Sequence, residues 1–276
     1  MPGSSDQKPK SAAELIADQA EAYEAHVLRR RGGDLLVAVA LRRSDGRVVP
    51  YALSIDAQST VPKVREQTPD RLPGFCPDRH INSDGTFCMG WQAADPLNVI
   101  DASTAGVWWA RLLRFLNLQE AARKLRRWPG SREWAHGDAA IPQYRAEVCA
   151  KALGSNFEQA LAAMNLTTVR RRGRAGFAAL MIGKRRLYSV WIGAQRVATL
   201  RQACFCGSGR PLCSCGDHAD RAAELVFAIE ARERAEKEFW QLAKGRPCCG
   251  TLATCPLRQT PEPANADAPT VTQKAA

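Results

Sequence analysis

Ten cysteines, seven of them crowded into two short stretches, limit the folds open to this chain more than any other property. The stretches are CFCGSGRPLCSC, beginning at Cys204, and CCGTLATC, beginning at Cys248. Residues 1–14 lack the apolar segment of a secretion signal, and no apolar run reaches the roughly 18 residues that cross a membrane. We therefore expect a cytoplasmic protein, in which clustered thiols are metal ligands more often than disulfides.

The two stretches carry enough ligands for two tetrahedral zinc ions, since thiolates and imidazoles are the donors that Zn²⁺ prefers. The pattern Cys204-x-Cys206-Gly-Ser-Gly, followed by Cys215, resembles the small zinc motif at the end of the bacterial secretion motor ATPase. The residue after Cys215 is a glycine, so His218 or Cys213 has to supply the fourth ligand. One zinc with spare thiols and a disulfide-linked region are the alternatives. The candidate ligands are Cys204, Cys206, Cys213, Cys215, His218, Cys248, Cys249 and Cys255.

The N-terminal part of the chain changes from a helical to a strand pattern. Residues 11–30 have apolar side chains at near-helical spacing, and Ser11 with Glu14 matches a capping box, so a helix is expected there. Two apolar, β-branched runs then flank the turn at residues 44–46, which predicts a hairpin, and residues 63–67 predict a short third strand. The expected order is a helix followed by an antiparallel meander.

The rest of the chain is expected to form helices around a short β region. Helices are expected over residues 103–127 and 143–153, and an amphipathic helix over 219–244 lies between the two cysteine stretches. Residues 178–202 have the apolar and β-branched runs of two or three strands. The last eighteen residues carry too little apolar surface to fold and are expected to be a disordered tail.

The stretch CPDRHINSDGTFCMGW, residues 76–91, contains two cysteines, a histidine and an asparagine around a turn-forming Asp-Gly pair. These residues alone allow two interpretations of Cys88. It can bind zinc together with Cys76 and His80, because ligands clustered on one loop are common in metal sites. It can also act as a nucleophile, because a thiolate attacks carbonyl groups readily.

The segment RHINSDGTFCMGW resembles the active-site segment of ubiquitin-conjugating enzymes, in which His-Pro-Asn precedes a short glycine-containing loop and the thioester-forming cysteine. The expected order of helix, antiparallel meander, motif, loop and helix agrees with that family. The resemblance implies that Cys88 is the nucleophile, that Asn82 stabilises the oxyanion and that His80 orders the loop. It places Asp138 as the group that positions and deprotonates the incoming amine, with His136 as a substitute base.

Two departures point to the divergent bacterial branch of this family: Ile81 stands where the family usually has proline, and the loop before Cys88 is short. That branch is found in operons with an activating enzyme, a ubiquitin-like protein or a nucleotide-second-messenger synthase. The resemblance thus implies a conjugating enzyme that carries a protein C-terminus as a thioester on Cys88 and transfers it to an amine, in antiphage defence. Its expected partners are a ubiquitin-like modifier or protein C-terminus, an activating enzyme and a nucleotidyltransferase, with zinc as a structural cofactor.

The expected fold class is α+β. A ubiquitin-conjugating-like domain, with an N-terminal helix, an antiparallel meander and C-terminal helices, precedes a small zinc-stapled α/β region. The expected boundaries are a flexible N-terminus over residues 1–10, the conjugating domain over 11–165, the basic cysteine-rich region over 166–258 and the tail over 259–276.

Two other functions fit the same sequence. The fold can serve as an inactive adaptor for a ubiquitin-like or signalling protein, although inactive relatives usually lack the cysteine that Cys88 represents.

The net charge is +11, and residues 159–216 contain ten basic and no acidic residues, which predicts an acidic partner. The partner can be an acidic protein that docks on this segment. If the chain is instead a zinc-dependent nucleic-acid-binding protein, the partner is a polynucleotide. Few aromatic residues interleave the basic ones, which disfavours a platform for stacked bases. The densest basic run contains Arg170, Arg171 and Arg172.

Overall fold

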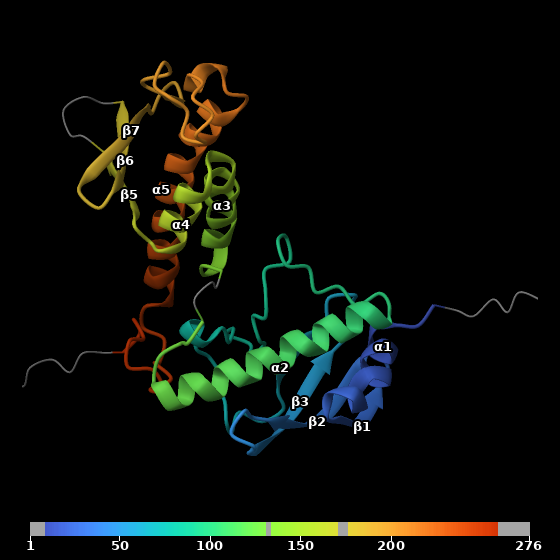
Figure 1. The fold of residues 1–276 in the computed structure, drawn as a ribbon. Coiled ribbons are helices and arrows are strands. Elements are labelled where there is room, and N and C mark those ends of the chain that lie inside the picture. The colour runs from blue at the N-terminus through green and yellow to red at the C-terminus, as the bar shows by residue number, and fades with distance from the viewer. Residues whose placement is uncertain (1–8, 131–133, 171–175, 259–276) are drawn as a thin grey trace, which may run out of the picture.

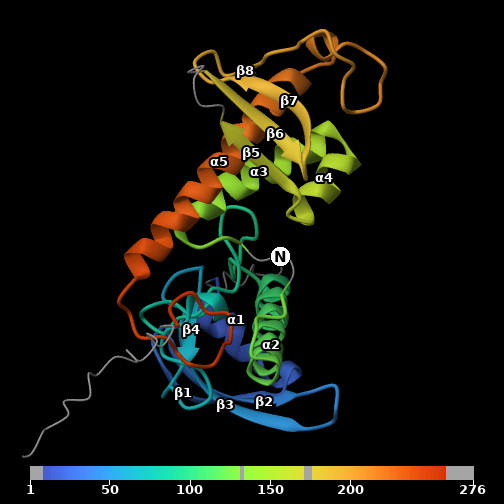
Figure 2. The ribbon, with the colours of Figure 1, turned by 90° about the vertical axis from the view of Figure 1, so that its left-hand side faces the viewer.

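The computed structural model describes residues 9–130, 134–170 and 176–258. In Figure 1 the chain forms two units, a lower one made by residues before 131 and an upper one made by residues 134–243. A long helix of the upper unit reaches down toward the lower one, and the chain beyond this helix lies against the lower unit (Figures 1 and 2). Each unit has a hydrophobic core of its own.

The lower unit is an antiparallel sheet in the order β1-β2-β3-β4, accompanied by two helices. The hairpin predicted around residues 44–46 and the short strand predicted over 63–67 are confirmed by β2, β3 and β4. Trp108, Trp109 and Leu112 of α2 are fully buried in the core that the sheet shares with both helices. The elements are α1 (Ala12–Gln19), β1 (Ala25–Arg31), β2 (Asp34–Arg42), β3 (Val48–Asp56), β4 (Lys63–Glu66) and α2 (Ala102–Leu125).

The helix expected over residues 11–30 is wrong in its second half. α1 begins with the predicted capping box between Ser11 and Glu14, but it ends before a 3₁₀ turn, η1 (Ala20–Tyr23). Glu24 then takes a left-handed backbone conformation, with φ of 54°, and the chain enters β1. β1 pairs with β2, so backbone hydrogen bonds to a buried strand outweigh the weak helical pattern of these residues.

The upper unit packs three helices with a second antiparallel sheet. α3 and α5 lie side by side in Figure 1, and Leu153, Leu180 and Leu225 are fully buried in the cluster that unites the helices with the sheet. The strands predicted within residues 178–202 and the helix predicted over 219–244 are confirmed. The elements are α3 (Ala140–Leu153), α4 (Ser155–Ala162), β5 (Leu166–Arg170), β6 (Phe177–Ile182), β7 (Arg185–Trp191), β8 (Arg196–Val197) and α5 (His218–Ala243).

The two units divide earlier in the chain than the sequence suggests. The sequence places α3 and α4 in the first domain, residues 11–165, whereas in the structure both helices share the buried cluster of α5. The apolar face of α3, which includes Cys149, needs a partner, and the periodicity of α3 does not say which part of the chain provides it.

The C-terminal segment, residues 244–258, leaves α5 and returns to the lower unit. The Ala253 N–H donates to the Arg126 carbonyl at 2.7 Å, just after the end of α2. Leu252 is fully buried in a small apolar cluster of its own, which includes Cys76 from the loop of residues 76–91. The segment therefore fastens the upper unit to the lower one beside that loop.

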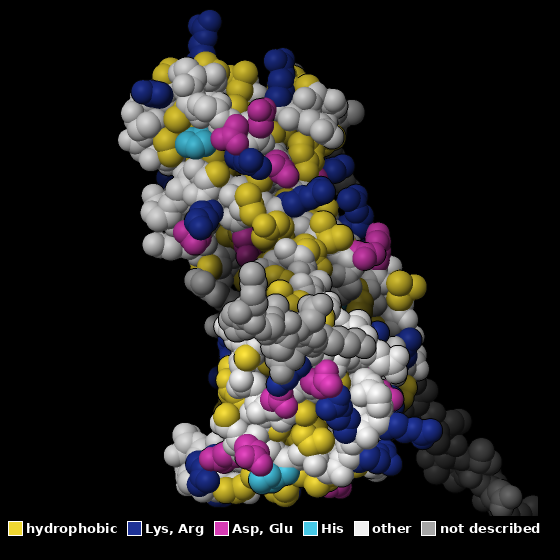
Figure 3. Space-filling model, turned by 90° about the vertical axis from the view of Figure 1, so that its right-hand side faces the viewer, with side chains coloured by type: hydrophobic (Ala, Val, Ile, Leu, Met, Phe, Trp, Pro, Cys, Tyr) yellow, Lys and Arg dark blue, Asp and Glu magenta, His cyan; other side chains and the backbone are white. Residues whose placement is uncertain are grey.

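The basic segment, residues 159–216, is partly neutralised by the rest of its unit. Arg170 forms a bidentate ion pair with Glu230 of α5, at 3.0 and 2.7 Å. Figure 3 shows the face opposite β5–β7, and there Lys and Arg side chains are interspersed with Asp and Glu. Arg171 and Arg172 lie outside the described residues. Glu230 neutralises one positive charge of the segment, and the acidic partner expected from the remaining charge stays a prediction.

Most of the expected flexible ends lie outside the described ranges. The structure describes only residues 9 and 10 of the N-terminal stretch and nothing after residue 258, so both expectations stay predictions. Within the described part of the chain, no helix is long and apolar enough to cross a membrane.

Candidate functional site

The loop of residues 76–91 is held in shape by close backbone pairing. Cys76 and Ile81 exchange two hydrogen bonds, with N to O distances of 3.1 and 3.0 Å. The Cys88 N–H donates to the His80 carbonyl at 2.8 Å. Cys88 is therefore fixed beside the motif histidine, and its side chain is half-buried.

Cys88 and Asn82 line the same pocket, which has a volume of about 600 Å³. The loop forms one part of the lining, and residues 134–137 together with the end of α5 form another. The side chain of Asn82 is oriented within the loop, because its Nδ2 donates to Thr86 Oγ1 at 3.0 Å. Thr86 Oγ1 in turn donates to Asp84 Oδ1 at 2.6 Å, so the amide is held by a chain of two hydrogen bonds.

His136 reaches this pocket from the segment before α3 and is held by α5. Its Nδ1 lies 2.6 Å from Glu236 Oε1, and its backbone N–H donates to Glu236 Oε2 at 3.0 Å. The ring stacks on Phe239 with a centroid distance of 4.8 Å, and Trp240 Nε1 donates to Glu236 Oε1 at 3.0 Å. The other ring nitrogen, Nε2, is buried and has no partner with hydrogen-bond geometry among the described residues. The Pro77 carbonyl nonetheless contributes to the pKa of the ring.

The pKa values of the two histidines of the pocket are shifted in opposite directions. Burial lowers the pKa of His136, but its hydrogen bond with Glu236 and the charge of that carboxylate outweigh burial, and the net pKa is raised above the usual value. Burial, followed by the charge of His136, lowers the pKa of His80 to about 4. The centroid of the His80 ring lies 5.1 Å from that of Trp128 and 6.0 Å from that of His136. A neutral, packed His80 is suited to ordering the loop.

Asp138, which the resemblance assigns to the amine, does not line the pocket. It is exposed in the 3₁₀ turn η3 (Gly137–Ala139), whereas His136, two residues earlier, does line the pocket. Of the two residues that the resemblance offers as a base, only His136 therefore lies at the pocket of Cys88. The expected site residues that line one pocket are Cys88, Asn82, His80 and His136.

Near the start of α5, Cys204, Cys206, Cys215 and His218 form a compact group whose four ligand atoms all lie within 4.8 Å of one another. Cys204 Sγ and Cys215 Sγ lie 3.1 and 3.4 Å from His218 Nδ1, and Cys206 Sγ lies 3.6 Å from Cys215 Sγ. Three thiols and one imidazole match the donor set of a structural zinc site, and here His218 occupies the fourth position. Cys213 is exposed and lies outside this group.

The backbone around the group turns sharply and places hydrogen-bond donors beside Cys206. Gly207 has φ of 78°, a conformation that side chains rarely adopt, and it turns the chain between Cys206 and Ser208. Hydrogen bonds from the side chain and backbone of Ser208 lower the pKa of Cys206 to about 6, whereas burial raises the pKa of Cys204 to about 11. His218 is the first residue of α5, so a bound ion joins the turn to the helix. These residues fit Zn²⁺.

The other zinc interpretation, with Cys76, His80 and Cys88 as ligands, has no support in the described residues, where these three do not form a metal-ligand group. Cys76 does not line the pocket of Cys88. Its Sγ instead lies 3.1 Å from Cys249 Sγ in the C-terminal segment.

Two protein families match the chain in tandem. The family described as "Prokaryotic E2 domain" matches residues 23–130, and the family described as "Cysteine-rich domain, C-terminal to E2 domain" matches residues 135–257. The chain is a prokaryotic E2 domain followed by a cysteine-rich domain. No curated protein and no solved structure matches it. The family and the α+β fold class expected from the sequence are thereby confirmed, and α3 falls in the cysteine-rich domain.

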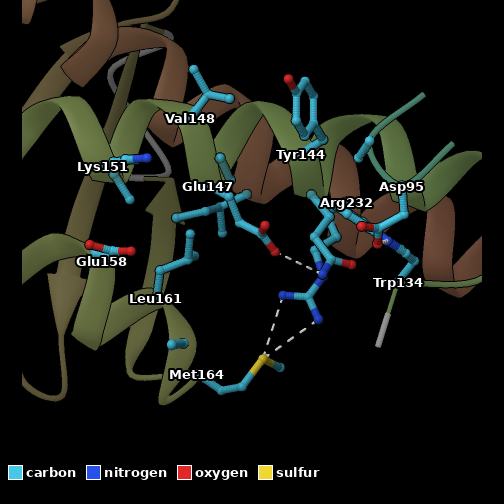
Figure 4. A pocket seen from close by; sticks show the side chains of 16 residues that line it. Asp95, Trp134, Tyr144, Glu147, Val148, Lys151, Glu158, Leu161, Met164 and Arg232 are labelled. Atoms are coloured by element: carbon cyan, nitrogen blue, oxygen red, sulfur yellow. Dashed lines mark hydrogen bonds between the residues drawn. The ribbon is translucent and has the colours of Figure 1, made fainter. Parts of the chain in front are cut away.

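A second pocket, of about 590 Å³, lies mainly on the cysteine-rich domain (Figure 4). Figure 4 shows Arg232 of α5 beside Met164, and both terminal nitrogens of the guanidinium lie 3.5 Å from the sulfur. No cysteine or histidine is among the residues that line this pocket. It therefore offers no thiol, whereas the pocket of Cys88 on the E2 domain does.

Glu236 is the residue of this site that the sequence does not reveal. It lies 100 residues after its partner His136, on a helix of the cysteine-rich domain that carries many other charged side chains. Neither spacing nor composition distinguishes it from those neighbours. The cysteine-rich domain thus completes the pocket of the E2 domain, a relation that only the folded chain makes visible.

Proposed function

We propose that this protein is a conjugating enzyme that carries the C-terminus of a ubiquitin-like modifier as a thioester on Cys88 and transfers it to an amine. One observation carries the proposal: a thiol, an oriented amide and a carboxylate-bound histidine line a single pocket. The presence of an E2 domain supports the same reaction class. The residues assigned to the reaction are Cys88, Asn82 and His136.

In the first transfer, Cys88 receives the acyl group. Its thiolate attacks the carbonyl of the thioester on the activating enzyme, a tetrahedral oxyanion forms, and the cysteine of the activating enzyme leaves as a thiolate. One C–S bond forms and one breaks, so no oxidant or metal is needed. The backbone bond from Cys88 to the His80 carbonyl holds the nucleophile in the loop during this exchange.

In the second transfer, the nitrogen of an amine attacks the carbonyl of the Cys88 thioester. Asn82 Nδ2 donates a hydrogen bond to the oxyanion, Nε2 of His136 accepts a proton from the amine, and the Cys88 thiolate leaves as the C–S bond breaks. Glu236 acts as a positioning residue. By accepting from Nδ1–H, it keeps Nε2 as the basic nitrogen of the neutral ring.

An inactive adaptor accounts less well for these residues. A binding surface needs neither a thiol in a pocket nor a histidine held by a carboxylate. Burying a charged pair such as His136 and Glu236 carries a desolvation penalty, and such pairs with shifted pKa values are typical of sites of proton transfer. The pocket is therefore better explained as a reaction site.

The loading reaction tests the proposal. With the activating enzyme, the modifier and ATP, the wild-type protein is expected to form an adduct that thiols cleave. Cys88→Ala should abolish this adduct, because no other residue assigned to the reaction is a nucleophile of this kind. Cys213→Ala, which alters an exposed cysteine outside the pocket, is the matched control and should load like wild type. An adduct of undiminished yield on Cys88→Ala would refute the proposal.

The pH dependence of discharge tests the role of His136. Nε2 accepts a proton only when the ring is neutral, so the discharge rate, corrected for protonation of the amine itself, should rise with pH through the pKa of His136. Because Glu236 raises that pKa, the rise should be centred above the usual value for histidine. Glu236→Gln removes the charge, and the rise should move to lower pH. His136→Gln should slow discharge by about 10²–10⁴-fold.

The control for this measurement is Glu224→Gln, since Glu224 also lies on α5 but pairs with Arg221, away from the pocket. Its pH profile should coincide with that of wild type. A profile that stays in place for Glu236→Gln would mean that another group accepts the proton.

The resemblance to the divergent bacterial branch extends the proposal to antiphage defence. An activating enzyme is then the partner that loads Cys88, and a nucleotidyltransferase or another protein with a free C-terminus supplies the acyl group or the target. If this extension holds, cells carrying the native gene neighbourhood should resist phage, and Cys88→Ala should restore plaque formation. Equal plaque counts with the intact genes and with the variant would contradict the defence role while leaving the loading reaction as a separate question.

A further inference from the structure

Four cysteines from distant parts of the chain gather where the C-terminal segment meets the E2 domain. Cys76 comes from the loop of the E2 domain, and Cys248, Cys249 and Cys255 come from the segment after α5. Cys249 Sγ lies 3.1 Å from Cys76 Sγ, and the side chains of Cys248 and Cys255 form a second pair in hydrogen-bond contact. All four belong to the small apolar cluster around Leu252.

Two of these sulfurs have polar groups of the C-terminal segment beside them. The Gly250 N–H donates to Cys248 Sγ at 3.4 Å, and Cys249 Sγ lies 3.0 Å from Thr251 Oγ1. N–H donors stabilise a sulfur that carries negative charge, as the thiolate ligands of a metal do.

Disulfide bonding and simple packing explain this arrangement less well than a metal does. The sulfurs of Cys76 and Cys249, at 3.1 Å, are further apart than the roughly 2.05 Å of a disulfide. Simple packing does not by itself account for three thiols of the C-terminal segment gathering at the thiol of Cys76. Cys76 and Cys255 are 1% and 5% exposed, and Cys248 and Cys249 are half-buried, so most of the group is shielded from water, as the ligands of structural metal sites are. The four sulfurs are less closely gathered than the ligands at Cys204, but they lie in one cluster and have the number and type of donors of a tetrahedral zinc site, and a bound ion would draw them together.

We infer that Cys76, Cys248, Cys249 and Cys255 bind a second structural Zn²⁺, which joins the end of the cysteine-rich domain to the E2 domain. Each thiol releases its proton to solvent as its sulfur bonds to the metal. The sequence alone assigns both sets of ligands to the C-terminal stretches, with Cys213 among them. In the folded chain, Cys76 of the E2 domain joins the cysteines of the second stretch, and Cys213 does not belong to either group.

This second site lies directly behind the pocket of Cys88. The backbone of Cys76 is paired with Ile81, and the next residue, Asn82, lines the pocket. On the other side, Arg246 precedes Cys248 by two residues and also lines the pocket. The ion thus fixes the loop and the end of the cysteine-rich domain to each other. The inference stands on these contacts and does not depend on the proposed acyl transfer.

Zinc content and the zinc ligands of the full-length protein, purified under reducing conditions, test the inference without any substitution. We expect about two zinc ions per chain by elemental analysis. X-ray absorption at the zinc edge should give an average of about 3.5 sulfur ligands per zinc, the mean of a four-sulfur and a three-sulfur site. One zinc per chain with three sulfur ligands would overturn the inference.

Variants then assign the second ion to its ligands. Cys255→Ala and Cys76→Ala should each lower the content from about two zinc ions per chain to about one, and Cys206→Ala should do the same by emptying the other group. Cys213→Ala is the matched control and should keep both ions. Cys76→His restores a ligand at the same position and should retain both ions with fewer sulfurs per zinc, which separates loss of a ligand from loss of the fold.

Two results would contradict the inference. One is Cys76→Ala with both ions retained and the same number of sulfurs per zinc, since Cys76 would then not be a ligand. The other is a disulfide between Cys76 and Cys249, found by mass spectrometry of the protein purified under reducing conditions, since those sulfurs would then be unavailable to a metal.

Discussion

Replacing Asn82 with alanine is expected to leave loading of Cys88 intact and to slow discharge to an amine by about 10²–10³-fold. Loading exchanges one thioester for another, and the proposal assigns Asn82 to the oxyanion of the second transfer, the aminolysis, alone. The Nδ2 of Asn82 is held by Thr86 Oγ1 at 3.0 Å on the wall of the pocket, where an oxyanion forms as the amine attacks. Removal of a donor that acts only in the transition state lowers the rate of the chemical step. The measurement is single-turnover discharge of the loaded protein to free lysine.

Asn117→Ala is the matched control, because Asn117 is an exposed amide of α2 that donates to the Leu113 carbonyl and does not line the pocket. It should load and discharge like wild type. Asn82→Asp keeps the shape of the side chain but loses the N–H donor, so it should discharge at least as slowly as Asn82→Ala. Normal discharge by both Asn82 variants would remove Asn82 from the reaction.

Loss of the metal from the group at Cys204 is expected to unfold much of the cysteine-rich domain while the E2 domain stays folded. Structural zinc contributes about 10–16 kcal/mol of apparent binding free energy in small zinc peptides, and whole domains are stable by only about 5–15 kcal/mol. Cys204→Ser should therefore expose the amides of β6, β7 and the first turns of α5 to hydrogen exchange. The amides of β2 and β3, in the separate core of the E2 domain, should remain protected.

Cys213→Ser provides the comparison for this measurement, since Cys213 is exposed and outside the Cys204 group. Its exchange pattern should match that of wild type. Equal protection of the cysteine-rich domain in Cys204→Ser, wild type and metal-free protein would show that the apolar cluster alone holds the domain together.

The parts of the fold that could be predicted are those determined by local pattern. The capping box of Ser11 and Glu14 and the hairpin around residues 44–46 depend on neighbours within a few residues, and both are present. The strand β1 could not be predicted in this way. Its side chains after Ala25 are exposed, so the strand has no alternation of buried residues to identify it, and its pairing with β2 determines its conformation.

The same distinction applies to the site. The motif predicts Cys88 and Asn82 from a short stretch of sequence, and the structure lines one pocket with both. Glu236 and Cys76 acquire their roles from residues 100 and 173 positions away, His136 and Cys249. Contacts across such separations depend on how the cysteine-rich domain docks on the E2 domain, which the periodicity and composition of either domain do not encode.

The central claim is that Cys88 itself carries the acyl group, and the intact mass of the loaded protein before and after thiol treatment tests it most directly. For wild type, the mass of the modifier should be gained on loading and lost with thiol, since a thiol displaces a thioester. Cys88→Ser should instead gain the same mass as an oxygen ester, which resists thiol and is released by mild alkali. If the modifier on Cys88→Ser is still released by thiol, the acyl group is attached to another cysteine and the account is contradicted.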